Sequence, residues 1–175
     1  MEWACNRPGR DGFCNAYELD AAELAVVDLD EDPNGVLAWL AVLMEHRVFD
    51  MEWNVAQTKD RFIERYRADL SGADVVCGYR ADDSYFSIAR AFVMGVITDK
   101  QAADALRFGD LGRQVMIRSQ RAFDALTFRG AEHAAASVWY PRWVSRDAAA
   151  RRSFRQMREA DGGEPGRRIF ELVGD

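Results

Sequence analysis

The sequence is poor in cysteine, histidine and lysine, and it contains no long hydrophobic run. Its 175 residues include three cysteines without a C-x-x-C pair, which argues against a disulfide framework and a zinc knuckle. The longest uncharged apolar run, residues 36–44, is about half the length of a membrane span. No basic, apolar signal segment follows Met1. We therefore expect a cytoplasmic chain that has no metal site and no membrane contact.

Acidic and basic residues are unevenly distributed along the chain. The net charge is −6, yet residues 1–100 carry 19 acidic and 10 basic groups, whereas residues 101–175 carry 10 and 13. Lys59 and Lys100 are the only lysines, so arginine supplies most of the positive charge. Arginine-rich composition alone does not indicate nucleic-acid binding. Because 49% of the residues are hydrophobic, one sizeable core is expected.

Hydrophobic periodicity predicts a mixture of strands and helices. Residues 13–19 alternate as a strand, residues 24–29 are a second strand candidate, and together they are expected to form a two-stranded unit. Asn34 is the predicted cap of a helix over residues 36–47, and Gly95 closes another helix that ends near residue 94. Thr98 begins a capping box for the next helix. The remaining predictions are a helix over 55–69, strands over 73–78, 114–119 and 127–138, and a short helix after Ser119.

Common catalytic motifs are absent. The sequence lacks a phosphate-binding loop, a dinucleotide fingerprint and a nucleophile elbow. His46 and His133 are isolated from other ligand residues, which favours structural roles. The acidic residues within 28–32 are typical of a solvated loop. The alternative is a binding site for a hard cation, but these residues lack the spacing of an EF-hand.

Four polar residues are candidates for a binding site. Asp82, Asp83 and Tyr85 lie between a predicted buried strand and a helix, where open sheets place ligand groups and helix amides attract anions. Alternatively, the aspartates are ordinary helix caps and Tyr85 is a core residue. Gln114 opens a predicted strand after a glycine-flanked turn, and its amide could bind a sugar hydroxyl.

Several motifs together resemble a bacterial family. They are ADVVCGYRADDSY at residues 73–85, GVIT at 95–98, ADAL at 103–106 and LGRQV at 111–115. The chain resembles, over about residues 1–128, a domain of unknown function that is grouped with ADP-ribosyltransferase-like toxins. The resemblance implies an α+β fold around a split, mostly antiparallel sheet, with NAD as the substrate. It also implies that Gln114 contacts the nicotinamide ribose, with Asp82, Asp83 and Tyr85 lining the cleft.

The departures from that family pattern leave two interpretations open. Family members begin with Tyr-His-Gly and Gly-x-Gly-Phe-Tyr segments, which this chain lacks, and Tyr79 replaces the usual proline. Residues 1–138 are therefore expected to be an N-terminally incomplete ADP-ribosyltransferase-like domain. One interpretation is a shortened toxin or effector; the other is a pseudoenzyme that has lost NAD chemistry. Glutamine at position 114 can position a hydroxyl but cannot act as an anionic base.

Two further functions remain as alternatives. The first is a non-catalytic interaction module, bound by an antitoxin-like partner or self-associating through an open sheet edge. The second is nucleic-acid binding by residues 139–175, an Arg/Trp-rich helix starting at Ser145 and a tail, because arginine and aromatic side chains suit phosphates and bases. In the competing interpretation, Trp143, Phe154 and Met157 pin this helix to the core.

Overall fold

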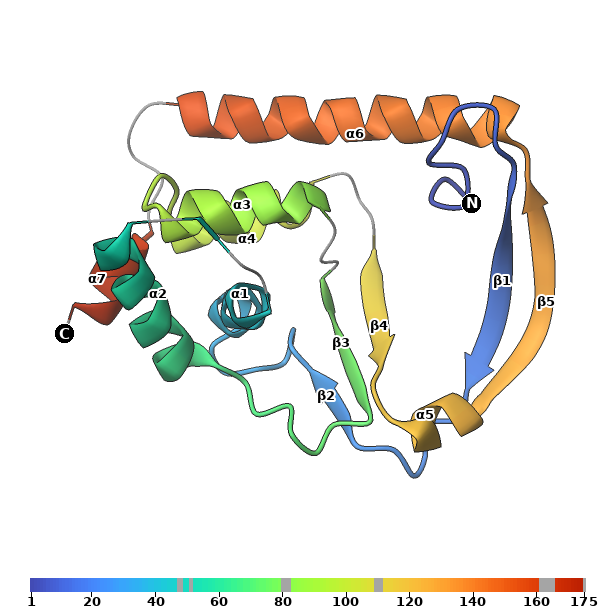
Figure 1. Ribbon diagram of the computed structural model, residues 1–175, viewed down its shortest axis with the longest axis horizontal. Coiled ribbons are helices and arrows are strands. Elements are labelled where there is room, and N and C mark those ends of the chain that lie inside the picture. Colours follow the sequence, from blue (N-terminus) through green and yellow to red (C-terminus); the bar gives the residue numbers. More distant parts are fainter. Residues whose placement is uncertain (47–48, 51, 80–82, 109–111, 161–165, 175) are drawn as a thin grey trace.

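The computed structural model describes residues 1–46, 49–50, 52–79, 83–108, 112–160 and 166–174, and Figure 1 shows its arrangement. The strands are β1 (Gly12–Leu19), β2 (Val26–Asp28), β3 (Val75–Tyr79), β4 (Arg113–Ile117) and β5 (Leu126–Ala134). The helices are α1 (Val36–Glu45), α2 (Trp53–Tyr66), α3 (Asp83–Val93), α4 (Asp99–Ala105), α5 (Gln120–Asp124), α6 (Ala136–Glu159) and α7 (Ile169–Val173). The expected α+β class is confirmed.

The first sheet has the strand order β2–β3–β4. β2 runs parallel to β3, and β4 runs antiparallel to it, with Gly78 of β3 opposite Gln114 of β4. Val76 of β3 is buried together with Leu29 and with Val42 of α1. The sheet is therefore anchored on α1 through a small apolar cluster.

The second sheet consists of β1 and β5 alone, paired antiparallel from Gly12 and Ala134 to Leu19 and Leu126. The predicted pairing of residues 13–19 with 24–29 is therefore wrong. Alternation reveals a strand but not its partner. A carboxylate oxygen of Asp74 accepts a hydrogen bond from the Ala25 amide at 2.9 Å, which aligns β2 beside β3 instead of β1.

The main core lies among α1, α2, α3, α4 and α7. Phe62 of α2 is fully buried, and its ring centroid lies 5.3 Å from that of Phe92 of α3 in an edge-to-face contact. Apolar residues at helical spacing face this core from α3, α4 and the residue after α4: Ile88, Ala89, Phe92, Val93, Ala102, Ala105 and Leu106 are all buried. α7 joins this core through Ile169 and Leu172.

Two predicted helix ends are confirmed and one is wrong. Thr98 forms the capping box with Gln101, with reciprocal bonds of 3.3 and 3.0 Å. The chain turns after α3 at Gly95, where the Val96 amide donates to the Ala91 carbonyl at 2.8 Å, as in a Schellman end. Asn34 does not cap α1: Gly35 is the capping position and offers no side chain.

Helix α6 begins at Ala136 rather than at the predicted Ser145. The reason lies outside the helix, because a carboxylate oxygen of Asp11 accepts a hydrogen bond from the Ala136 amide at 2.8 Å and so caps the helix from a distant segment. α6 then extends from the β1–β5 sheet to the helical core, as Figure 1 shows, where Phe154 and Met157 pack against that core. The expected division of the chain after residue 138 stays a prediction.

No helix in the described part of the chain is long and apolar enough to cross a membrane.

Candidate functional site

Gln114 lies where β3 ends. In the β3–β4 register it is opposite Gly78, and Arg113 is opposite Tyr79. The side chain of Gln114 is exposed, and its amide has no hydrogen-bond partner among the described residues. The pairing of β3 with β4 thus places the Gln114 amide beside the end of β3, from which the chain leads toward α3.

The other three predicted site residues follow that strand end in the chain. Asp82 lies outside the described residues, whereas Asp83 and Tyr85 belong to the first turn of α3. The side chains of Asp83 and Tyr85 are not among those described. The backbone therefore brings Gln114 to the start of this segment, and the roles of all four residues stay predictions.

An ion-pair cluster crosses the β2–β3–β4 sheet next to this strand end. The Arg113 guanidinium pairs with the carboxylate of Asp28 and lies 3.4 Å from that of Asp30. Burial raises the pKa of the Cys77 thiol, and the negative charge of Asp30 adds to that effect, so Cys77 is not an activated nucleophile. No group of three or more metal-ligating side chains is present among the described residues.

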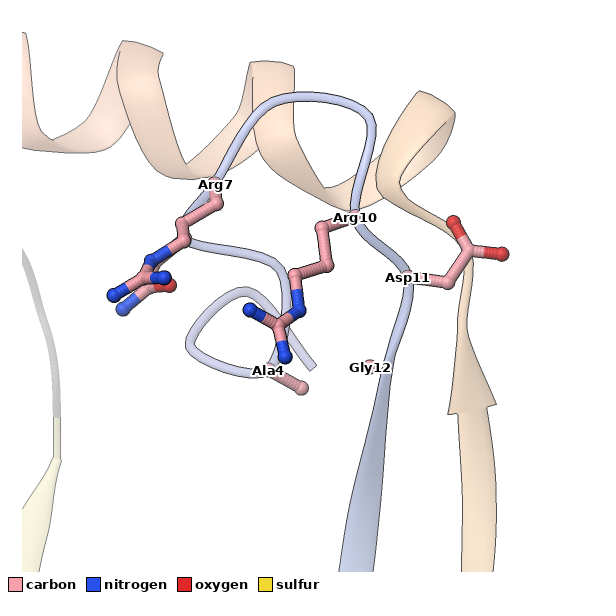
Figure 2. A pocket seen from close by; sticks show the side chains of 6 residues that line it. Ala4, Arg7, Arg10, Asp11 and Gly12 are labelled. Atoms are coloured by element: carbon pink, nitrogen blue, oxygen red, sulfur yellow. The ribbon is translucent and has the colours of Figure 1, made fainter.

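A second candidate site is a cavity of about 370 Å³ in the N-terminal segment, shown in Figure 2. The guanidinium groups of Arg7 and Arg10 lie on the same side of the loop, whereas the Asp11 carboxylate points to the other side, toward β5 (Figure 2). The full lining consists of Ala4, Asn6, Arg7, Arg10, Asp11 and Gly12.

The loop that carries this cavity is fixed at both ends. On its N-terminal side, Cys5 is fully buried and its thiol donates to the Ala134 carbonyl at 3.0 Å. On the other side, Gly12 lies so close to Ala4 that an added Cβ would stand 2.1 Å from the Ala4 carbonyl oxygen. Only glycine permits this approach, because it has no Cβ. The glycine at position 12 therefore allows the loop to close against Ala4.

Asp11 is already engaged away from the cavity. The hydrogen bond from the Ala136 amide is the main cause that lowers the Asp11 pKa, and the bond to His133 lowers it further. His133 Nε2 lies 3.0 Å from the Asp11 carboxylate, and its ring packs on Phe13 with a centroid distance of 5.5 Å. The predicted structural role of His133 therefore has a specific partner.

Two arginines of α6, Arg142 and Arg158, lie over aromatic rings of the same helix, whereas Arg146 and Arg151 pair with carboxylates. The Arg142 guanidinium lies 4.8 Å from the Trp139 ring centroid, and Tyr140 stacks on Trp143 at 6.0 Å. Trp143 also meets Trp3 edge-on at 6.5 Å. The prediction that Trp143 pins the helix to the main core is thus corrected: it contacts the N-terminal segment.

The fold is a mixed α+β domain with two small sheets, and its family is shown by comparison. Residues 1–128 match the family described as a protein of unknown function, DUF3990. The chain belongs to this family. No curated protein and no solved structure matches the chain.

Sequence reasoning missed the Arg7–Arg10 cavity. The signal was present in the Arg-Pro-Gly-Arg turn at residues 7–10, but a turn in sequence does not reveal which groups neutralise its charges. The partners that occupy Asp11 are 122 residues or more away, beyond the reach of any local pattern.

Proposed function

We propose that this chain is an ADP-ribosyltransferase-like toxin or effector domain that binds NAD beside the ends of β3 and β4. The observation that carries the proposal is the pairing of Gln114 with Gly78. It brings the amide to the strand end that precedes Asp82, Asp83 and Tyr85, the residues for which the family resemblance implies a nucleotide cleft. The Gln114 amide has no hydrogen-bond partner among the described residues, which supports the same assignment.

The chemistry needs positioning more than it needs a base. In the proposed reaction, the bond between ribose and nicotinamide breaks, nicotinamide leaves with the electron pair, and an acceptor lone pair forms the new bond. The ribose passes through an oxocarbenium-like state, so the site must orient the sugar and stabilise developing charge. Gln114 can hydrogen-bond a ribose hydroxyl through its amide, which is the role assigned to it.

The test is NAD binding measured by calorimetry. Gln114→Ala is expected to weaken binding about tenfold, the effect of one hydrogen bond in a desolvated site. Gln57→Ala changes another exposed glutamine, on α2, and is expected to leave NAD binding unchanged. Equal affinity in the wild type and Gln114→Ala would contradict the site assignment.

A second variant examines catalysis separately from binding. Gln114→Glu introduces a carboxylate at the strand-start position where related transferases place a glutamate, and it is expected to raise the rate of nicotinamide release above that of the wild type. Nicotinamide is measured by chromatography after incubation with NAD. Binding without release in both proteins supports the pseudoenzyme interpretation.

A second candidate function, an interaction module, is favoured by the aromatic face of the β1–β5 sheet. Phe13, Tyr17 and Phe128 are between 55 and 66% exposed, and they share one face with His133. β1 and β5 each pair with no other described strand, so their outer edges are open to an antitoxin-like partner or a second copy. Sedimentation velocity over a wide concentration range tests self-association; a monomer throughout argues against a second copy.

A further inference from the structure

Two arginines are held side by side by a tight turn. Arg7 and Arg10 occupy the first and fourth positions, with Pro8 and Gly9 between them, and the Arg10 amide donates to the Arg7 carbonyl at 3.5 Å. Gly9 has a φ of +67°. Proline followed by a positive-φ glycine is typical of a type II turn, which brings its end residues within about 7 Å of each other. The turn therefore brings the positively charged residues Arg7 and Arg10 close together.

The positive charge of this pair is not neutralised by the described residues. In the same N-terminal segment, the carboxylate of Glu2 forms an ion pair with Arg146 at 2.8 Å, and that of Asp11 accepts from the Ala136 amide and contacts His133. Neither the Arg7 nor the Arg10 guanidinium has an ion pair or hydrogen bond within the described part of the chain. Both groups are thus available to an external anion.

The cavity beside them is preorganised. The Cys5 thiol bond to Ala134 and the close contact of Gly12 with Ala4 fix the loop on both sides of the turn, which reduces the ordering cost of binding. Its volume of about 370 Å³ falls at the lower end of the range for small-molecule sites, roughly 300–1,000 Å³.

We propose that the cavity lined by Arg7 and Arg10 binds the phosphate group of a small phosphorylated molecule. Guanidinium groups match phosphate oxygens with paired hydrogen bonds, and two of them balance a dianion. The Asn6 side chain in the lining adds a neutral polar group. The net charge of −6 and the acidic first half of the chain disfavour a long polyanion, so a small ligand fits better than a nucleic acid. This assignment does not rest on NAD chemistry at Gln114.

The charge test uses inorganic pyrophosphate as the probe, titrated into the full chain by calorimetry at low ionic strength. Arg7→Gln and Arg10→Gln are each expected to weaken binding by about tenfold or more, because each removes a charge-assisted contact. Arg61→Gln makes the same charge change at an exposed position of α2 and is expected to change little. Gln114→Ala is expected to have no effect, which separates this site from the proposed NAD site.

The geometry test keeps both arginines and alters the turn. Gly9→Val is expected to weaken pyrophosphate binding about tenfold, because a β-branched residue disfavours the φ of +67°. Gly9→Asn tolerates that conformation and is expected to retain binding. Circular dichroism and the thermal midpoint verify that each variant is folded.

Three results would overturn the proposal. They are equal pyrophosphate affinity in the wild type and the Arg7→Gln, Arg10→Gln double variant, equal weakening by Arg61→Gln, and full binding by a folded Gly9→Val. A short RNA that binds more tightly than pyrophosphate through the same two arginines would replace the small ligand with a nucleic acid.

Discussion

Phenylalanine side chains are buried in the helical core but exposed on the β1–β5 sheet. Phe62 and Phe92 in the helical core are fully buried, whereas Phe13 and Phe128 of the β1–β5 sheet are 66 and 56% exposed. The five helices of the core bury apolar side chains between them, although Trp53 of α2 and Phe170 of α7 stay exposed. The β1–β5 sheet has α6 and the N-terminal segment at one end and α5 at the other, as Figure 1 shows.

The helical core is therefore expected to supply most of the stability, whereas the β1–β5 sheet keeps apolar surface that is available for recognition. A compact monomer of 19.8 kDa exposes roughly 8,600 Å², and this molecule exposes 10,709 Å². The excess indicates an open shape in which apolar burial is concentrated in the helical core. We therefore expect substitutions in the two regions to differ strongly in their effect on the free energy of unfolding.

The largest expected effect is that of Phe92→Ala. Removing a fully buried ring leaves a cavity, and we expect a loss of about 3–5 kcal/mol in the free energy of unfolding. Phe128→Ala removes the same ring from the exposed sheet and is expected to cost about 1 kcal/mol or less. Urea denaturation followed by circular dichroism measures both. Similar losses would show that the β1–β5 sheet is as tightly integrated as the helical core.

A helix-cap comparison is expected to give a smaller difference. Thr98 is 8% exposed and caps α4 within the helical core, so Thr98→Ala should cost about 1–2 kcal/mol. Ser119 accepts from the Ala122 amide at 3.1 Å at the start of the five-residue α5 and its hydroxyl also hydrogen-bonds Asp74, so Ser119→Ala should cost about 1 kcal/mol. The same urea titrations apply, and a reversed order would contradict the comparison.

The contrast also explains which features could be predicted from the sequence. The helical core was predictable because its signals are local: Thr98 and Gln101 are three residues apart, and the inward positions of α3 and α4 follow helical spacing. The partner of β1 was not predictable, because an alternating pattern fits any neighbouring strand. The start of α6 depends on Asp11, which lies 125 residues away.

The candidate site was predictable only in part. The resemblance pointed to Gln114 and to residues 82–85, and the strand register then placed Gln114 at the end of β3. The Arg7–Arg10 pair could be located as a turn but not as a site. The two arginines lack acidic partners because Glu2 and Asp11 bind groups that are distant in the sequence. Composition and spacing do not reveal those contacts.

Acid titration probes the contact between the β2–β3–β4 sheet and α5, which leads into β5. Asp74 accepts hydrogen bonds from the Ser119 hydroxyl, the Ala25 amide and Arg121, and these lower its pKa from 3.8 to about 2. Because the folded-state pKa is depressed, its stabilising contribution is complete above pH 4 and is lost as the pH falls through about 2. We expect the urea midpoint of the wild type to fall more steeply over that window than that of Asp74→Asn. Parallel curves would contradict this linkage.

The smallest expected effect belongs to the aromatic face of the β1–β5 sheet. Tyr17 is 55% exposed, and its ring centroid lies 5.5 Å from that of Phe128 across the strand pair. Tyr17→Thr keeps a residue that favours strands and removes only this cross-strand contact, so we expect a loss of about 0.5 kcal/mol. Urea denaturation at two protein concentrations measures it. A loss above about 2 kcal/mol that grows with protein concentration would mean that this face is covered by a second copy in solution, and the contrast with the helical core would then hold only for the isolated chain.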